Sequence, residues 1–170
     1  NNVKKKHIVI HATADYEGRR WGIQNFVELV HLVETDLINI EKIFFVGSKG
    51  DFGLIGEIVN KCSSIVANAS GEYSLLELKE LIENSTLFIG NDSGPMHIAS
   101  FSGTPTIGLM GPNHPKISGP VGRNSSSVYH ELECSPCDQR ICDLNYECIK
   151  RISVEEVFDR AQRICNDDNA

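Results

Sequence analysis

Hydrophobic residues along this 170-residue chain follow two alternating spacings. Short continuous apolar runs, which are typical of strands buried on both faces, occupy residues 7–11, 43–46, 64–67, 87–90, 106–109 and 127–130. Between these runs, apolar residues recur every three or four positions, which predicts amphipathic helices around residues 26–33, 54–62, 75–82 and 154–164. Ser74 with Glu77 and Ser153 with Glu156 have the spacing of capping boxes, so a helix should begin directly after each serine.

This alternation of strands and helices predicts the fold class. It indicates βαβ units and a parallel sheet with helices on both faces, an α/β, Rossmann-like domain. We expect residues 1–170 to form one such domain. Residues 111–124 are rich in Gly and Pro and are predicted to form a loop. Ligands of such folds bind beyond the carboxyl ends of the strands, so the segments that follow the strands are the places to search for a site.

Composition and charge narrow the kind of partner. A formal net charge of -7 and a pI near 5.3 disfavour a nucleic acid, because proteins that bind nucleic acids usually carry a basic face. A small-molecule ligand fits better. Without an apolar stretch of membrane-spanning length or a signal peptide at the start, the chain is expected to be soluble and cytoplasmic. Because the chain starts at Asn1 and not at Met, we expect a fragment of a longer protein.

The segment from residue 88 to residue 112 carries the most informative chemistry. It has the pattern of a strand, a polar elbow, a helix and a second strand; the first apolar run ends at Gly90, and Pro95 stands in the first turn of the predicted helix. The free N–H groups of such a turn attract anions. With Asp92 and His97 beside it, the elbow suits a phosphate and a polyol, the two halves of a nucleotide sugar. From the residues alone, Asp92 is equally well explained as a helix cap, and His97 as an ordinary solvated or core histidine.

Two other strand ends carry polar groups to the same rim. The loop after the first strand holds Thr13, Arg19 and Arg20, and the planar guanidinium fork suits phosphate oxygens, although both arginines can equally be plain surface charges. Trp21 is expected to anchor the following helix in the core. Asp51, in the glycine-containing loop after the second strand, has the chemistry to bind ribose hydroxyls, but on spacing alone a turn aspartate is favoured.

Two common nucleotide motifs are absent from the sequence. The first strand is not followed by G-x-G-x-x-G, which disfavours NAD, and no G-x-x-x-x-G-K-[ST] forms a Walker loop.

The string from Gly90 to Pro112 resembles the signature of glycosyltransferase family 9, the lipopolysaccharide heptosyltransferases. That signature is D-[ST]-G-x-x-H-x-A followed by G-x-P-T and a G-P turn. His11-Ala-Thr before Arg19-Arg20-Trp21 is similar to another segment of the family, which has a basic residue two positions before Trp. The tail is also similar to that of many members, so the resemblance spans nearly the whole chain; its residues are Cys134, Cys137, Cys142, Cys148 and 152–157.

The resemblance implies the carboxyl-terminal half of a two-domain GT-B architecture, the half that binds the nucleotide sugar. It implies donor contacts from Thr13, Arg19, Asp51, Asp92, Ser93, Gly94 and His97. Asp92 would meet hydroxyls of the donor sugar, and Arg19 would stabilise the leaving diphosphate. Asp51 stands where a glutamate usually meets the ribose, and its side chain is shorter. The general base of the family, an acidic residue early in the amino-terminal domain, has no counterpart in this chain.

The implied activity is inverting transfer of heptose, or a related sugar, from an ADP-sugar to a lipopolysaccharide core or another glycan acceptor. No metal or other cofactor is expected, because fixed charges can balance the leaving group. The acceptor would be bound by the absent amino-terminal domain, and the whole enzyme would be cytoplasmic or peripheral at the inner membrane. The alternative is a non-catalytic module that binds a nucleotide or nucleotide sugar. An epimerase of the same architecture would need acid and base residues that the sequence does not reveal.

The chain has six cysteines, of which four follow the spacing C-x2-C-x4-C-x5-C, namely Cys134, Cys137, Cys142 and Cys148. This spacing is compatible with zinc, with an iron–sulfur cluster, with two disulfides or with reduced, packed thiols. Since the resembling family catalyses transfer without a metal, reduced thiols or a bridge are favoured over a metal. Cys62 and Cys165 fall on apolar helix faces and are expected in the core.

Overall fold

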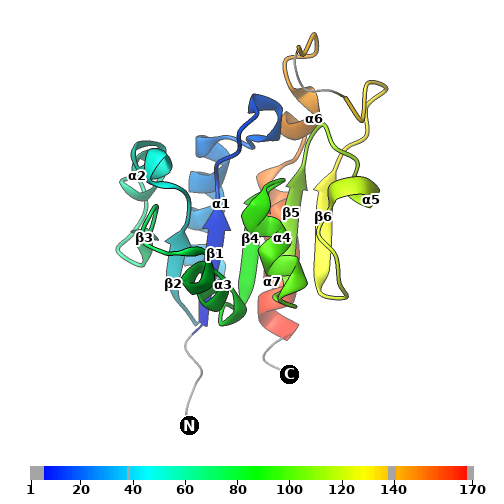
Figure 1. The fold of residues 1–170 in the computed structure, drawn as a ribbon. Coiled ribbons are helices and arrows are strands. Elements are labelled where there is room, and N and C mark those ends of the chain that lie inside the picture. The colour runs from blue at the N-terminus through cyan, green and yellow to red at the C-terminus, as the bar shows by residue number, and fades with distance from the viewer. Residues whose placement is uncertain (1–5, 38, 138–140, 168–170) are drawn as a thin grey trace.

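The computed structural model of the chain describes residues 6–37, 39–137 and 141–167. Its centre is a parallel sheet of β1 (Lys6–His11), β2 (Ile40–Phe45), β3 (Val66–Asn68), β4 (Leu87–Asn91), β5 (Thr106–Met110) and β6 (Ser125–Tyr129). The strands lie in the order β3-β2-β1-β4-β5-β6, and each neighbouring pair is parallel (Figure 1). All six predicted strands are confirmed, with ends that differ from the prediction by at most three residues.

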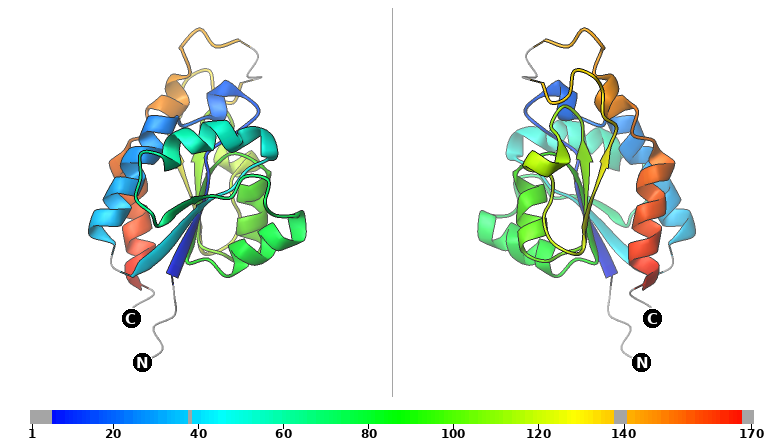
Figure 2. Two further views of the ribbon diagram at one scale, coloured as in Figure 1. Left: turned by 90° about the vertical axis from the view of Figure 1, so that its left-hand side faces the viewer. Right: turned by 90° about the vertical axis from the view of Figure 1, so that its right-hand side faces the viewer.

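Helices cover both faces of the sheet, as predicted (Figure 2). One face carries α1 (Ile23–Asp36) and α7 (Val154–Asp167), with α2 (Phe52–Val59) packed beside α1; the other carries α3 (Leu75–Glu83) and α4 (Gly94–Phe101). Both capping boxes are confirmed, because the backbone N–H groups of Ser74 and Ser153 donate to Glu77 and Glu156 at 2.8 and 3.0 Å.

Four shorter helical turns complete the described chain: η1 (Glu17–Arg19), η2 (Lys49–Asp51), α5 (Pro115–Ser118) and α6 (Glu147–Lys150). The prediction of a loop over residues 111–124 is wrong at α5. Pro115 is set for the first turn of a helix, and the His114 ring accepts a hydrogen bond from the Lys116 N–H at 3.1 Å, which caps that turn.

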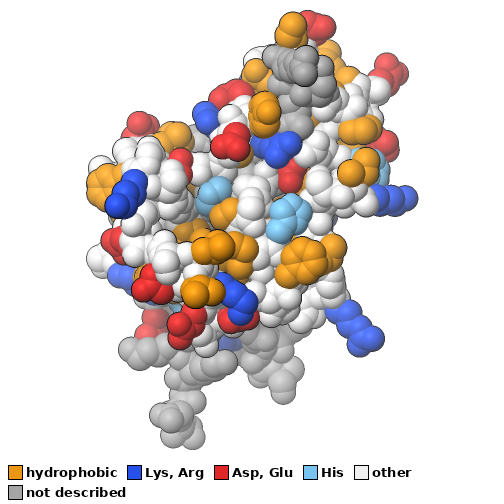
Figure 3. All heavy atoms as spheres, in the orientation of Figure 1, with side chains coloured by type: hydrophobic (Ala, Val, Ile, Leu, Met, Phe, Trp, Pro, Cys, Tyr) orange, Lys and Arg blue, Asp and Glu red, His pale blue; other side chains and the backbone are white. Residues whose placement is uncertain are grey.

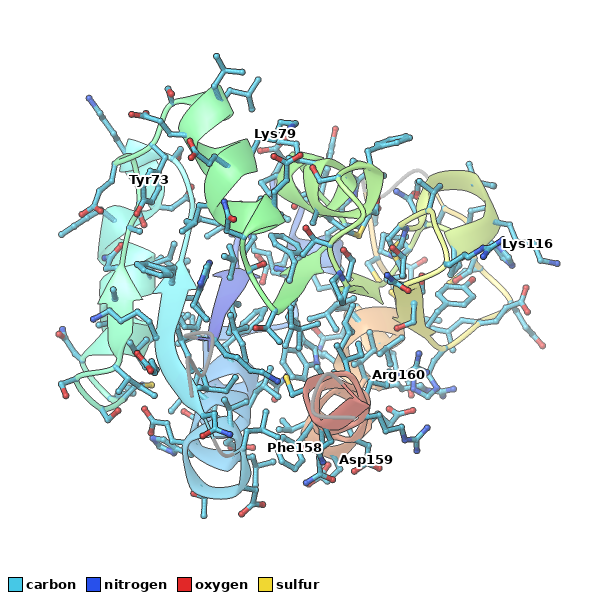
Figure 4. The ribbon with its side chains drawn as sticks, turned by 90° about the horizontal axis from the view of Figure 1, so that it is seen from below. Tyr73, Lys79, Lys116, Phe158, Asp159 and Arg160 are labelled. Atoms are coloured by element: carbon cyan, nitrogen blue, oxygen red, sulfur yellow. The ribbon has the colours of Figure 1, made fainter. Side chains whose placement is uncertain are left out.

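The core lies in two layers, one on each face of the sheet. Alternate residues of a strand point to opposite faces, so Ile8 and Ile10 of β1 pack with α1 and α7, whereas Val9 packs with Met96 of α4. The view from below shows the same division, with Phe158 of α7 on one side of the sheet and Tyr73 and Lys79 on the other (Figure 4).

Trp21 is 2% exposed, and its Nε1–H donates to the Ile152 carbonyl at 2.8 Å. Its predicted anchoring role is therefore confirmed.

The strand order places a crevice between β1 and β4. From β1 the chain winds towards β2 and β3, and from β4 it winds towards β5 and β6, so the loops that follow β1 and β4 separate at their common edge. Ligands of open parallel sheets bind at this point. His11 at the end of β1 stands in register with Gly90 of β4, so both strands end at the crevice. None of the described helices is both long and apolar enough to span a membrane.

Candidate functional site

Arg19 and Asp92, from two different strand ends, meet in the crevice. The η1 turn brings Arg19 Nε to 3.7 Å from Asp92 Oδ2, with side-chain exposures of 24% and 4%. The guanidinium carbon of Arg19 also lies 5.2 Å from the centre of the Tyr16 ring. A second bond fixes Asp92, since Asn113 Nδ2 donates to its Oδ2 at 2.6 Å. The crevice thus holds a cation and an anion in one place, both expected to contact a donor.

The alternative role of Asp92 as a helix cap is wrong. The residue that precedes α4 is Ser93, in an extended conformation, and no side chain caps the helix. Asp92 instead turns towards Arg19 and Asn113. A Cβ added at Gly94 would meet nothing within 4 Å, so the first turn of α4 is open to a ligand. Backbone N–H groups at such a helix end favour an anion.

A buried histidine connects the elbow to the loop that follows β1. His11 is 7% exposed; its Nδ1 lies 3.0 Å from Ser93 Oγ and its Nε2 lies 3.2 Å from Thr13 Oγ1. Ser93 Oγ also donates to the Asn91 carbonyl at 3.0 Å. Burial lowers the pKa of His11 to about 4, although Asp51 and Asp15 act in the opposite direction. The ring is therefore neutral at pH 7, and the hydroxyl of Ser93 is engaged by protein groups.

Asp51 acts as a turn aspartate and also lies beside the hydrogen bonds between His11, Thr13 and Ser93. Its carboxylate accepts hydrogen bonds from the Ser48 N–H at 2.7 Å and from the Ser48 hydroxyl at 2.6 Å, at the start of η2. Burial raises the pKa of Asp51, but the hydrogen bonds from Ser48, with His11 and Thr13, outweigh burial and hold it below its usual value. Asp51 therefore lies beside Thr13 and is charged, at the rim where the ribose contact is expected.

The other two basic residues considered for the site, His97 and Arg20, occupy different positions. His97 lies on α4, one turn after Ser93, and is half-buried. Arg20 Nε donates to the Ala14 carbonyl at 2.7 Å, and its Nη1 lies 3.3 Å from Glu17. Arg20 therefore supports its own loop, whereas Arg19 faces the crevice.

A groove of about 240 Å³ begins beside the first turn of α4. The residues that line it come from the carboxyl ends of the strands, from α3 and the segment before it, and from the first turn of α4: His11, Val46, Gly47, Ser48, Ala69, Tyr73, Leu75, Leu78 and Pro95. Hydrophobic side chains gather over α3 and α4 on this face of the molecule (Figure 3). The groove thus joins an apolar wall to the polar ends of the strands.

A larger, open hollow of about 770 Å³ lies away from this crevice. It is lined by Pro105, residues 123–126 and the side of α7 that carries Asp159 and Arg160 (Figure 4). Arg160 donates to the Ser127 carbonyl at 2.9 Å, which ties α7 to β6. The hollow lies at the amino-terminal end of β5, opposite to the edge of the sheet where ligands of this architecture bind.

The four clustered cysteines border a small apolar cavity together with Gly18 of η1 and Pro112. In the described part of the chain, none of the six cysteines forms a disulfide. Burial raises the pKa of Cys148, and the neighbouring thiols of Cys142, Cys137 and Cys134 raise it further, which places the four sulfurs near one another. Within residues 6–37, 39–137 and 141–167, no group of three or more His, Cys, Asp or Glu is arranged to hold a metal ion. The absence of a metal stays a prediction.

The other two cysteines lie where they were expected. Cys165 is 4% exposed, and Cys62 is half-buried against the same core layer.

Sequence reasoning missed two residues of the crevice, His11 and Asn113. His11 was assigned to the end of a strand, although the alternation of side chains along β1 places it on the face that carries Val9 and α4. Asn113 lies in a segment without periodicity, and nothing in the sequence marked its contact with Asp92.

A family model described as glycosyltransferase family 9 (heptosyltransferase) matches residues 1–147. The chain belongs to glycosyltransferase family 9. The lipopolysaccharide core heptosyltransferase OpsX of Haemophilus influenzae is 30% identical over 131 residues, which are 75% of this chain and 37% of that protein. The chain spans about a third of the length of the curated relatives it matches.

Two solved structures show the fold of this family. The Escherichia coli ADP-heptose lps heptosyltransferase II superposes with a TM-score of 0.83 at 19% identity, over 99% of this chain and 49% of that chain. The E. coli heptosyltransferase WaaC, solved with ADP, gives 0.73 at 14% identity, over 96% of this chain and 46% of that chain. The expected family and fold class are therefore confirmed, and the roles of individual site residues stay predictions.

Proposed function

We propose that this chain binds the ADP-sugar donor of an inverting glycosyltransferase. The transferase would move heptose, or a related sugar, to a lipopolysaccharide core or another glycan acceptor. One observation carries the proposal: Arg19 meets Asp92, which lies close in sequence to the open first turn of α4, and Pro95 of that turn lines a groove with an apolar wall. Arg19 and the first turn of α4 match a diphosphate, Asp92 matches a sugar, and the apolar wall matches a nucleobase.

The diphosphate would lie over the first turn of α4. Backbone N–H groups at Gly94 and beyond donate to its oxygens, and Arg19 supplies a permanent positive charge. Thr13 adds a hydroxyl from the opposite loop. Because these groups are fixed before the reaction, they stabilise the charge that develops on the leaving ADP.

The nucleobase and the sugar of the donor would lie on opposite sides of the diphosphate. Tyr73, Leu75 and Leu78 form an apolar wall against which a flat base can pack, and Asp51 stands at the rim for the ribose. Asp92, held by Asn113, accepts hydrogen bonds from the sugar hydroxyls. In the free protein its charge is balanced by Arg19, so donor binding exchanges one ion pair for contacts with both halves of the donor.

The reaction would be a single displacement at the anomeric carbon. An acceptor hydroxyl loses its proton to a general base and attacks this carbon, while the bond to the diphosphate oxygen breaks and its electron pair leaves with ADP. The general base and the acceptor site are assigned to a part of the protein outside residues 1–170. A cytoplasmic location, with peripheral contact to the inner membrane, belongs to the same proposal.

The activities for which the relatives are named support this choice of donor and acceptor. They are lipooligosaccharide and lipopolysaccharide heptosyltransferases, and the solved structures include one with ADP and one with ADP-2-deoxy-2-fluoro heptose.

Calorimetric titration with ADP, ADP-heptose and matched UDP-sugars tests the proposal. We expect the ADP compounds to bind and the UDP-sugars to bind at least tenfold more weakly. Residues 1–170 alone should transfer no sugar, whereas the protein with its complete reading frame should transfer heptose to a lipopolysaccharide core acceptor. Binding without transfer by that longer protein would favour the non-catalytic module. Preference for UDP-sugars, or no binding of either class, would contradict the proposal.

A further inference from the structure

We propose that His11 is a positioning residue that sets the hydroxyl of Thr13 as a hydrogen-bond donor towards the diphosphate. The inference rests on the proposed function and adds a residue to it. His11 is the last residue of β1, and its ring also borders the groove beside Pro95. It therefore lies under the ligand site and touches both segments that would hold the phosphates.

The ring bridges two hydroxyls from distant parts of the chain. Nδ1 lies 3.0 Å from Ser93 Oγ, across 82 positions in sequence, and Nε2 lies 3.2 Å from Thr13 Oγ1. With 7% exposure, His11 has little access to water as a substitute partner. Each ring nitrogen is thus assigned to one hydroxyl, and one hydroxyl belongs to each side of the crevice.

A neutral imidazole couples these two hydroxyls, because it has one N–H and one lone-pair nitrogen. If Nδ1 carries the hydrogen, it donates to Ser93, and Nε2 accepts a hydrogen bond from the Thr13 hydroxyl. If Nε2 carries the hydrogen, it donates to Thr13, whose own proton is then free for an anion, and Nδ1 accepts from Ser93, whose hydroxyl then turns away from the Asn91 carbonyl. Thr13 can therefore donate to a phosphate and keep its bond to His11 only in the second arrangement.

The surroundings of His11 hold it in the neutral form that this coupling requires. Burial lowers its pKa to about 4, and the charged groups that act on it, Asp51 and Asp15, only partly offset that effect. Thr13 also bonds to Asp51, which lowers the pKa of that carboxyl. In the free protein the Thr13 proton thus has two acceptors at hand, His11 and Asp51, and a bound phosphate becomes the third.

Two substitutions separate the two sides of the ring. The side-chain amide of Gln reaches the position of Nε2, and that of Asn reaches the position of Nδ1. We therefore compare His11→Gln, which keeps a partner for Thr13, with His11→Asn, which keeps a partner for Ser93. Thr13→Val removes the hydroxyl itself. His31→Asn is the matched control, because His31 lies on α1 and bonds to the Lys61 carbonyl at 3.0 Å.

ADP affinity is measured by calorimetry on the protein with its complete reading frame. We expect His11→Asn and Thr13→Val each to weaken ADP binding roughly tenfold, the loss of about one hydrogen bond, and His11→Gln to stay within about threefold of wild type. In the Thr13→Val background, His11→Asn should add no further loss. Equal losses for Gln and Asn, or a full further loss in the double variant, would overturn the inference.

The wild-type protein supplies a second test that needs no variant to fold. Long-range ¹H–¹⁵N correlation spectra report which ring nitrogen of His11 carries the hydrogen. With ADP bound we expect the neutral Nε2–H form; the Nδ1–H form or an imidazolium would contradict the proposal. If the wild type binds neither ADP nor ADP-heptose, the proposed function fails. If it binds ADP and the ring has the wrong tautomer, only the role of His11 fails.

Discussion

Replacing Arg19 with Gln tests whether its pair with Asp92 is the charge centre of the donor site. The two side chains lie 3.7 Å apart, and Asp92 is almost fully buried. Removing the guanidinium therefore has two effects. The diphosphate loses a charged hydrogen-bond donor. It is also repelled by the buried carboxylate of Asp92, whose charge Arg19 no longer balances.

Both effects can be given a magnitude. A hydrogen bond to a charged group contributes about 1.5–3 kcal/mol. Repulsion between Asp92 and a phosphate charge at ~7 Å amounts to about 2 kcal/mol if the effective dielectric constant is ~20. Together they lead us to expect that Arg19→Gln weakens ADP binding by about 4 kcal/mol, which is roughly 1,000-fold in Kd. The double variant with Asp92→Asn lacks the repulsion of about 2 kcal/mol and should bind ADP roughly 30-fold more tightly than Arg19→Gln alone.

The single variant Asp92→Asn should behave in the opposite way. It keeps an oxygen for Asn113 and removes a negative charge beside the diphosphate, so ADP binding should stay level or improve. ADP-heptose binding should weaken by about 1.5–3 kcal/mol, because the sugar loses a charged acceptor. Equal effects on ADP and ADP-heptose would show that Asp92 does not recognise the sugar.

The assay is calorimetry with ADP and ADP-heptose at two salt concentrations, since screening should reduce the contribution of Arg19. Arg20→Gln is the matched control: it changes the net charge equally, but Arg20 is engaged by Ala14 and Glu17. We expect less than a twofold effect from it. If the double variant binds ADP no more tightly than Arg19→Gln, Asp92 and Arg19 do not act as a pair and the reasoning fails.

Three further predictions concern stability and the cysteines. Trp21→Phe removes the 2.8 Å bond to the Ile152 carbonyl and should lower the free energy of unfolding in urea by about 1–3 kcal/mol; an unchanged value would contradict the anchoring role. The pKa of His11 is about 4 when folded against 6.5 when unfolded, so the unfolded state binds more protons between these values and stability should fall by about 3 kcal/mol from pH 6.5 to pH 4. His11→Gln should flatten this pH dependence in urea titrations. Serine in place of the four clustered cysteines should leave ADP affinity within about threefold, and elemental analysis that finds zinc, lost with ADP affinity on chelation, would reverse the metal-free prediction.

The parts of the fold that the sequence predicts are those with a long hydrophobic period. All six strands and the five longer helices correspond to apolar runs or helical patterns, because each buries a face against the sheet. The sequence does not predict the turns α5 and α6, since four residues are too few to show a period of 3.6. At α5 the decisive feature is the cap by His114, a contact that periodicity does not encode.

The site divides in the same way between what the strands fix and what the loops decide. Parallel strands end at one rim, so the sequence already predicts that Arg19, Asp51 and Asp92 gather there. Which partner each side chain takes depends on the path of the loops: Asp51 turns to Ser48, and Asp92 turns to Arg19 and Asn113.

His11 belongs to the part that could have been predicted. With Ile8 and Ile10 on the face of α1 and α7, the alternation along β1 places His11 with Val9, on the face where α4 begins. The elbow places Ser93 directly before α4, so a contact between the two follows from the strand period and the helix start together. A polar residue at the last position of a central strand, on the face of the ligand-binding helix, is therefore a feature worth testing in other sheets with this strand order.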